Sequence, residues 1–104
     1  LAKNENEYLD KQALIEFDKI LIDDTNNKIV LCLKQFNKMD DVIKSRIILL
    51  AIEKTIGSTQ GIEKININDI IKLCNNNIGN KYLVPTKKIK VMVKSGKIFF
   101  LPEE

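Results

Sequence analysis

The sequence has no histidine, no tryptophan and only two cysteines among its 104 residues. Without an imidazole to act as a base, its serines give little support to nucleophilic catalysis of the Ser-His type. Cys32 and Cys74 stand far apart and outside any CxxC spacing, so no zinc site is expected. Both lie among apolar residues and are predicted to be buried thiols, which is typical of a cytosolic protein.

Glycine is also scarce, with four residues, and neither GxxxxGK[ST] nor GxGxxG occurs. No phosphate-cradling loop of either kind is therefore predicted. Two carboxylate pairs, Asp23-Asp24 and Asp40-Asp41, are better explained by a turn and a helix start than by acid–base catalysis. With no signal peptide, lipidation motif or apolar run of membrane-spanning length, we expect a cytoplasmic protein without a membrane partner. The residues alone predict neither an enzyme nor a cofactor or metal in this chain.

The net charge of +3 is unevenly distributed along the chain. Residues 1–24 hold three lysines against seven acids, a net charge of −4, so the remainder carries +7. This order suggests an acidic packing helix or linker followed by a surface that faces an anion. The alternative is that the lysines only solvate an ordinary surface.

The apolar spacing predicts an α+β fold: three helices with a small, mostly antiparallel sheet that ends in a C-terminal β-hairpin. Helical periodicity runs over 4–22, and a polar turn at 23–27 precedes a strand at 28–33. The densest apolar run, 42–56, predicts a central helix buried all round, which Asp40 or Asp41 caps and Gly57 ends. Asn66 with Asp69 resembles a capping pair for a third helix that runs to the Asn-rich stretch after Cys74.

The last segment predicts a hairpin in which Ser95-Gly96 is a two-residue turn. In that register Lys94 faces Lys97, and apolar and basic positions alternate along both strands. One face is expected to be core, and it contains Ile89, Val91, Val93, Ile98 and Phe100. The other is expected to be mixed basic and apolar, and it contains Lys90, Met92, Lys94, Lys97 and Phe99. A short strand at 81–85 ends in a proline, which removes a ladder donor.

The basic residues of the last quarter are the candidate binding residues for nucleic acid: Lys81, Lys87, Lys88, Lys90, Lys94 and Lys97. Tyr82 and Phe99 lie among them, and lysines neutralise phosphates while aromatic rings stack bases. The alternative is that these lysines only protect an edge strand from aggregation. Arg46, the sole arginine, is predicted either to pair with Glu53 or another acid, or to bind a phosphate.

Three stretches together resemble the region after the PP-loop ATP-binding domain of bacterial tRNA(Ile)-lysidine synthetases. Residues 6–10 with Ala13 are similar to the acidic E-x-Y-L-x-x-x-A helix that leaves the ATP-binding domain. Arg46-Ile47-Ile48-Leu49 is similar to the R-x-I-L start of the first substrate-domain helix. The order of 67–73, 79–85 and 90–99 is similar to the family's helix, G-K-x-x-x-L-P strand and closing hairpin.

Two features depart from the family pattern. Thr86-Lys87-Lys88 and Lys94-Ser95 stand where the family often has a glycine and an arginine, and lysine keeps the charge but loses the bidentate fork. The S-G-G-x-D-S phosphate loop of the catalytic domain does not occur.

The resemblance implies that 1–24 is a linker or packing helix from a missing catalytic domain, and that 25–104 is a tRNA-binding substrate domain. It implies that Arg46 and the lysines above contact tRNA(Ile). The whole protein would be an ATP-dependent ligase that uses ATP and Mg²⁺ to attach lysine to C2 of the wobble cytidine. Its partners would be tRNA(Ile) and the N-terminal ATP-binding domain. The alternative is a small protein-interaction or dimerisation module, such as a homodimer, which Met92, Phe99 and the open sheet edges favour.

Overall fold

The structure is a computed structural model that describes residues 2–76 and 81–103, with side chains from residue 4 onward. Its helices are α1 (Ala2–Ile20), α2 (Leu33–Phe36), α3 (Asp41–Ile56) and α4 (Lys64–Asn75). Its strands are β1 (Leu21–Thr25), β2 (Lys28–Cys32), β3 (Lys81–Thr86), β4 (Ile89–Lys94) and β5 (Lys97–Pro102). They form one antiparallel sheet in the order β1-β2-β5-β4-β3, so the predicted α+β class is confirmed.

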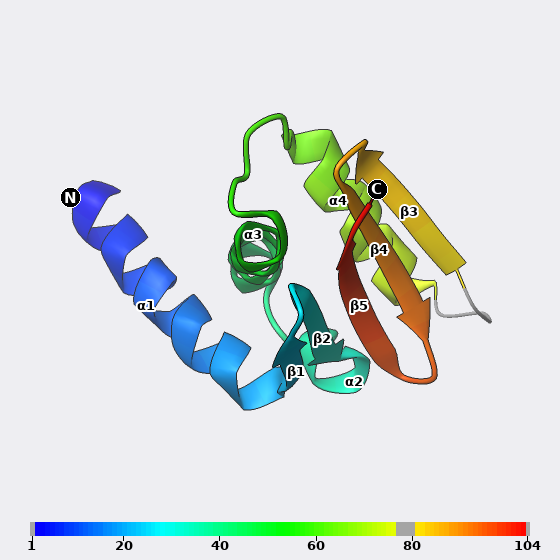
Figure 1. Cartoon of the computed structure of the whole chain (residues 1–104). Coiled ribbons are helices and arrows are strands. Elements are labelled where there is room, and N and C mark those ends of the chain that lie inside the picture. The colour runs from blue at the N-terminus through cyan, green and yellow to red at the C-terminus, as the bar shows by residue number, and fades with distance from the viewer. Residues whose placement is uncertain (1, 77–80, 104) are drawn as a thin grey trace.

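The helices pack on one face of this sheet, which we call the inner face, and the opposite side is the outer face. Inner-face side chains such as Leu31, Val91 and Phe100 share one core with Phe17 of α1 and Ile70 of α4. Figure 1 shows α4 behind β3 and β4, and α1 running along the side of the molecule with its N-terminus at the outer end. Among the described residues, the helices therefore cover one side of the sheet and leave the other open.

The central helix α3 lies between α1 and α4 and contacts the sheet through β2, β4 and β5. Ile47, Ile48 and Ile52 are fully buried, but Leu49 and Leu50 are only partly buried and Val42 is 47% exposed. The prediction of a helix buried all round is therefore wrong, because α1, α4 and the sheet cover three sides of α3 and its remaining side is open in the described part of the chain. Gly57 ends the helix with a φ of +80°, as predicted.

The predicted helix over 4–22 ends earlier, at Ile20, and the residues that follow it form β1 instead of a turn. β1 pairs with β2 through a tight turn in which Asn26 and Asn27 have φ of 54° and 58°. Asparagine tolerates this left-handed conformation, and two such residues give the turn that fits the twist of a hairpin. The strand predicted at 28–33, which is β2, therefore has a partner before it in the chain, β1, as well as one after it, β5.

The prediction of three helices is wrong by one short element, α2. The predicted strand stops at Cys32 instead of reaching residue 33, because β5 begins at Lys97, opposite Cys32, and offers Leu33 no strand residue to pair with. The Leu33 amide still donates to the Gly96 carbonyl at 3.0 Å. Leu33 and Phe36, three residues apart, then both enter the core. One turn of helix is the spacing that lets them do so.

The predicted caps of α3 and α4 also need correction. Asp40 occupies the N-cap position of α3, but its side chain makes no capping hydrogen bond. α4 begins at Lys64, and its capping box joins Glu63 to Asn66, whose side-chain oxygen accepts from the Glu63 amide at 2.7 Å. The reciprocal pair is therefore three residues earlier than Asn66 and Asp69, because Asn66 acts from inside the first turn.

The C-terminal hairpin has the predicted register. Lys94 pairs with Lys97, and Ser95 and Gly96 form the turn with φ of 54° and 75°. All five positions predicted to face the core are at most 1% exposed: Ile89, Val91, Val93, Ile98 and Phe100. Alternation along both strands therefore fixes which side chains lie on the outer face.

Candidate nucleic-acid interface

Three of the predicted binding residues, Lys90, Lys94 and Lys97, are brought together on the outer face of the hairpin. Each alternates with a buried inner-face residue, and Lys94 and Lys97 are direct cross-strand partners. Within 2–76 and 81–103, none of the three forms a salt bridge. Their charges are therefore available to an anion.

Two aromatic rings lie among these lysines, as the sequence predicts. Phe99 pairs with Met92 in the centre of the outer face, and Met92 pairs with Tyr82 of the edge strand β3. The Lys90 ammonium lies 4.5 Å from the centre of the Tyr82 ring, a cation–π contact that holds the lysine over the face of the sheet. Phe99 and Met92 are partly buried, and Tyr82 is 61% exposed.

A further lysine of the outer face, Lys28 of β2, is not among the predicted binding residues. Its ammonium lies 3.3 Å from Asp23 of β1, so its charge is compensated within the sheet. The Thr25 hydroxyl, which donates to the Asp23 carboxylate at 2.8 Å, and Lys28 lower the pKa of that carboxyl. The alternation of polar Lys28 with apolar Ile29 in the sequence could have predicted that Lys28 lies on the outer face.

The other predicted lysines do not join the outer face of the hairpin. Lys81 pairs with Val93, whose side chain points into the core, so Lys81 lies on the helix side of the sheet edge. Lys87 and Lys88 are exposed in the turn between β3 and β4. Gly79 and Asn80 of the family-like strand motif lie outside the described residues. A role of Lys81, Lys87 or Lys88 in RNA binding stays a prediction.

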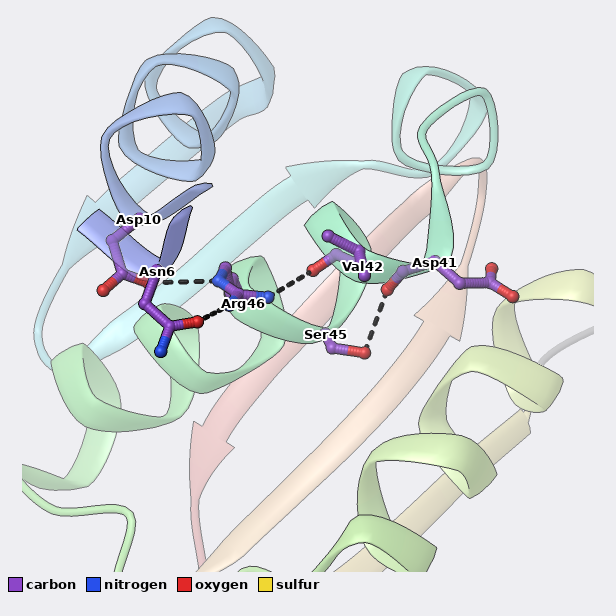
Figure 2. Close-up of polar contacts among 6 residues, drawn as sticks. All are labelled: Asn6, Asp10, Asp41, Val42, Ser45 and Arg46. Carbon is purple, nitrogen blue, oxygen red and sulfur yellow. Dashed lines mark hydrogen bonds and ion pairs between the residues drawn. The ribbon is translucent and has the colours of Figure 1, made fainter. Parts of the chain in front are cut away.

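Arg46 is held by α1, through an acid other than Glu53 (Figure 2). Its Nε donates to the Asp10 carboxylate at 3.1 Å and one terminal nitrogen donates to the Asn6 side chain at 3.2 Å. The other terminal nitrogen lies 3.3 Å from the Val42 carbonyl one turn back in α3. The guanidinium therefore joins two helices, and its predicted contact with RNA is not required to explain its position.

A buried cation that the sequence did not single out is Lys44, which is 5% exposed. Its ammonium lies 3.8 Å from Asp41 and 5.7 Å from the centre of the Phe36 ring. Cys74 is fully buried in the same core, and burial raises the pKa of its thiol to about 12. This thiol and Lys44 are interior groups and take no part in the outer face.

A second open surface is a groove between α1 and α3, away from the sheet. Leu14, Leu49 and Leu50 line it, with Asp10, Arg46 and Glu53 beside them. Leu14 is 46% exposed. The groove is thus apolar, with the Asp10–Arg46 ion pair and Glu53 in its lining, and it lacks the lysine cluster of the outer face of the hairpin.

The described part of the chain offers neither a metal centre nor a membrane-spanning helix. Its side chains form no group of three or more metal-ligating residues. Nor does any of its helices have the length and apolar character needed to cross a membrane.

Comparison with known proteins gives an informative match. Over 102 residues, 98% of the chain, the sequence is 28% identical to the tRNA(Ile)-lysidine synthase of Clostridioides difficile strain 630. The chain spans 22% of the length of that relative. No protein-family model matches. The match confirms the resemblance indicated by the three sequence stretches.

Proposed function

From this likeness to part of a tRNA(Ile)-lysidine synthase, we propose that the chain is the tRNA-recognition region of such an enzyme. The observation that carries the proposal is the outer face of the sheet. This face presents three lysines beside two aromatic rings, and none of these lysines forms a salt bridge in the described part of the chain. A polyanion such as tRNA complements this charge, and the contacts need no pocket because phosphates are reached from the surface. Lys90, Lys94 and Lys97 are the proposed phosphate contacts.

The chemical step belongs to other parts of the enzyme in this proposal. The whole protein would use ATP and Mg²⁺ to activate C2 of the wobble cytidine of tRNA(Ile), which lysine then attacks. The sequence of the present chain contains no phosphate-binding loop, so this proposal assigns ATP and Mg²⁺ to the rest of the enzyme. Its task is to bind the tRNA, in the cytoplasm where we expect the enzyme to act.

The groove between α1 and α3 is the proposed contact for the ATP-binding domain. α1 supplies exposed Tyr8 and Ile15 outside the groove and Leu14 within it. Exposed apolar side chains grouped on one helix indicate an interaction surface. Residues 1–24 would then both link and pack the two domains.

The test is tRNA binding at several salt concentrations by wild type and by the triple variant Lys90→Ala, Lys94→Ala, Lys97→Ala. Each phosphate that is no longer neutralised lowers the slope of log K against log salt by about 0.7–0.9, so the slope of the triple variant should fall by about 2–3 units. A matched control removes three exposed lysines from other surfaces: Lys11→Ala, Lys34→Ala, Lys38→Ala. Equal slopes for wild type and the hairpin variant would show that the outer face is the wrong surface.

The second candidate function is a homodimerisation or protein-interaction module. It is favoured by the edge strands β1 and β3, each with one neighbour in the sheet, and by Met92 and Phe99 on the open face. Sedimentation over a range of concentrations separates the two. A tight dimer that tRNA does not perturb would favour the interaction module over the tRNA-recognition region.

A further inference from the structure

An apolar row crosses the middle of the outer face, at right angles to the strands. Cross-strand pairing places Tyr82 beside Met92, Met92 beside Phe99, and Phe99 beside Val30. Side chains paired in this way lie about 4.5–5.5 Å apart, so the row is continuous over four strands. It spans three strand spacings, roughly 14 Å.

Exposure rises along this row from one end to the other. Val30 is 3% exposed between Asp23 and Phe99, whereas Tyr82 at the sheet edge is 61% exposed. Phe99 and Met92 lie between these limits. The row is therefore a shelf with a closed end on β2 and an open end on β3, and not a buried second core.

Lysines flank the row on both sides along the strands. Lys90 precedes Met92 by two residues, and Lys94 follows Met92 by two with Lys97 opposite it. Residues two apart on one strand are about 7 Å apart, so each ammonium can reach past the row into solvent. Lys90 also covers part of the Tyr82 ring at 4.5 Å, which fixes the charge next to the most exposed aromatic of the row.

We infer that Tyr82, Met92 and Phe99 form a stacking platform for unpaired RNA bases, and that Lys90, Lys94 and Lys97 hold the phosphates around it. This deepens the proposed tRNA-recognition role and rests on it. In an RNA duplex the base faces are hidden in the stack, and only phosphates, 2′-hydroxyls and groove edges are presented. An apolar shelf gains nothing from those groups, whereas it can cover the face of an unstacked base. The ligand class is thus single-stranded RNA, such as a loop.

Charge argues against a second copy of this chain as the occupant. Two outer faces in contact would bring the two sets of Lys90, Lys94 and Lys97 together, and none of these has a salt-bridge partner within the described chain. Like charges directly opposed are destabilising. Asp23, which lies next to Val30 at the closed end of the row, already pairs with Lys28, so its charge is compensated within the sheet.

The experiment compares a labelled 12-nucleotide single strand of mixed sequence, the corresponding duplex, and a tRNA(Ile) transcript. The variant is Tyr82→Leu with Phe99→Leu, which keeps apolar bulk and removes both rings. We expect it to bind the single strand roughly 5- to 100-fold more weakly, the range for removal of base–aromatic stacking, and the duplex within about twofold of wild type. Its salt slope should stay unchanged, because all three lysines are still present to neutralise phosphates.

Two controls keep the result interpretable. Tyr8→Leu removes an aromatic that is 67% exposed on α1 and should leave all three affinities unchanged. Tyr82→Leu alone changes a side chain that is 61% exposed, so weaker single-strand binding by that variant cannot be ascribed to unfolding. Circular dichroism checks the double variant.

The outcomes separate this inference from the proposed function. If the double variant binds the single strand as tightly as wild type while wild type binds tRNA(Ile), the platform is wrong and the proposed function stands. Equal weakening for strand and duplex would also overturn the platform. If the rings matter for the single strand but tRNA(Ile) is not preferred over other RNA, the platform stands and the proposed function fails.

Discussion

Phe99 and Phe100 are neighbours in β5, and their rings lie on opposite faces of the sheet. Phe100 is fully buried among helices, while Phe99 lies on the outer face between Met92 and Val30. The cross-strand partners of Phe100 are apolar. Phe99, in contrast, has Lys97 two residues before it on its own strand, and its partner Met92 has a lysine two residues away on each side. The same side chain thus serves the core at one position and a basic surface at the next, and the difference is set by strand alternation alone.

The largest expected effect comes from truncating the inner ring. Phe100→Ala should lower the free energy of unfolding by about 3–5 kcal/mol, because it leaves a cavity in a close-packed core. Phe99→Ala should cost less than about 2 kcal/mol, since that ring is already partly exposed. Urea denaturation with matched m-values measures both. Equal decreases would mean that the outer face is as much a core as the inner one.

The two cysteines sharpen the same comparison with a chemical probe. Cys32 is partly exposed on the outer face opposite Lys97, and Cys74 is fully buried. Burial raises the Cys74 thiol pKa to about 12 from 9.0, which lowers its thiolate fraction about a thousandfold at a given pH below 9. Under native conditions at pH 8 we expect one thiol per chain to react with iodoacetamide, and Cys32→Ser to abolish the reaction.

The same shift makes stability depend on alkaline pH. The pKa of the Cys74 thiol is higher in the folded protein than in the unfolded chain. The contribution of the buried, neutral thiol to the free energy of unfolding is therefore fully present below about pH 9, and it is lost as the pH rises from 9 toward 12. Cys74→Ser should flatten that part of the stability profile.

Bound RNA should protect Cys32 from alkylation if the outer face is the binding surface, and modification of Cys32 at an unchanged rate would argue against it.

The hairpin could be predicted in full, and the reasons are local. Alternation with a two-residue Ser95-Gly96 turn fixes the register, and register fixes both faces. The interaction of Arg46 could not be assigned, because its partner Asp10 is 36 residues away and only the packing of α1 on α3 brings them together. Sequence spacing on one helix favoured Glu53 instead.

The errors in the fold have a related cause. Leu21–Thr25 is polar enough to resemble a turn, and it becomes a strand because β2 supplies a pairing edge. Leu33–Phe36 has apolar residues only at its two ends, and it becomes a helix where β5, the partner of β2, begins at Lys97. In both cases a partner outside the segment decides its conformation, which local propensity does not contain.

A smaller effect is expected at Arg46, a cation that is held in an ion pair with Asp10. Arg46→Gln should lower the free energy of unfolding by about 0.5–1 kcal/mol, the range for a partly exposed ion pair. Asp10→Asn should cost a similar amount, and the double variant should cost less than the sum of the two. We expect the salt slope of tRNA binding to stay within about half a unit of wild type. A fall of one full unit would place Arg46 on the RNA.

The smallest effect is that of Ser95→Asn, in the turn that holds both faces of the hairpin in register. Ser95 and Gly96 both have positive φ, and asparagine adopts this conformation at lower cost than serine. Ser95→Asn should therefore raise the free energy of unfolding by about a few tenths of a kcal/mol, while Gly96→Ala should lower it by about 1 kcal/mol. No atom lies within 4 Å of a Cβ added at Gly96, so its cost is conformational and not steric. Lys94 and Lys97 flank the turn, so a disturbed turn should displace them. The affinity for single-stranded RNA should therefore fall with Gly96→Ala and stay constant with Ser95→Asn. A constant affinity in both variants would show that binding does not depend on the hairpin register.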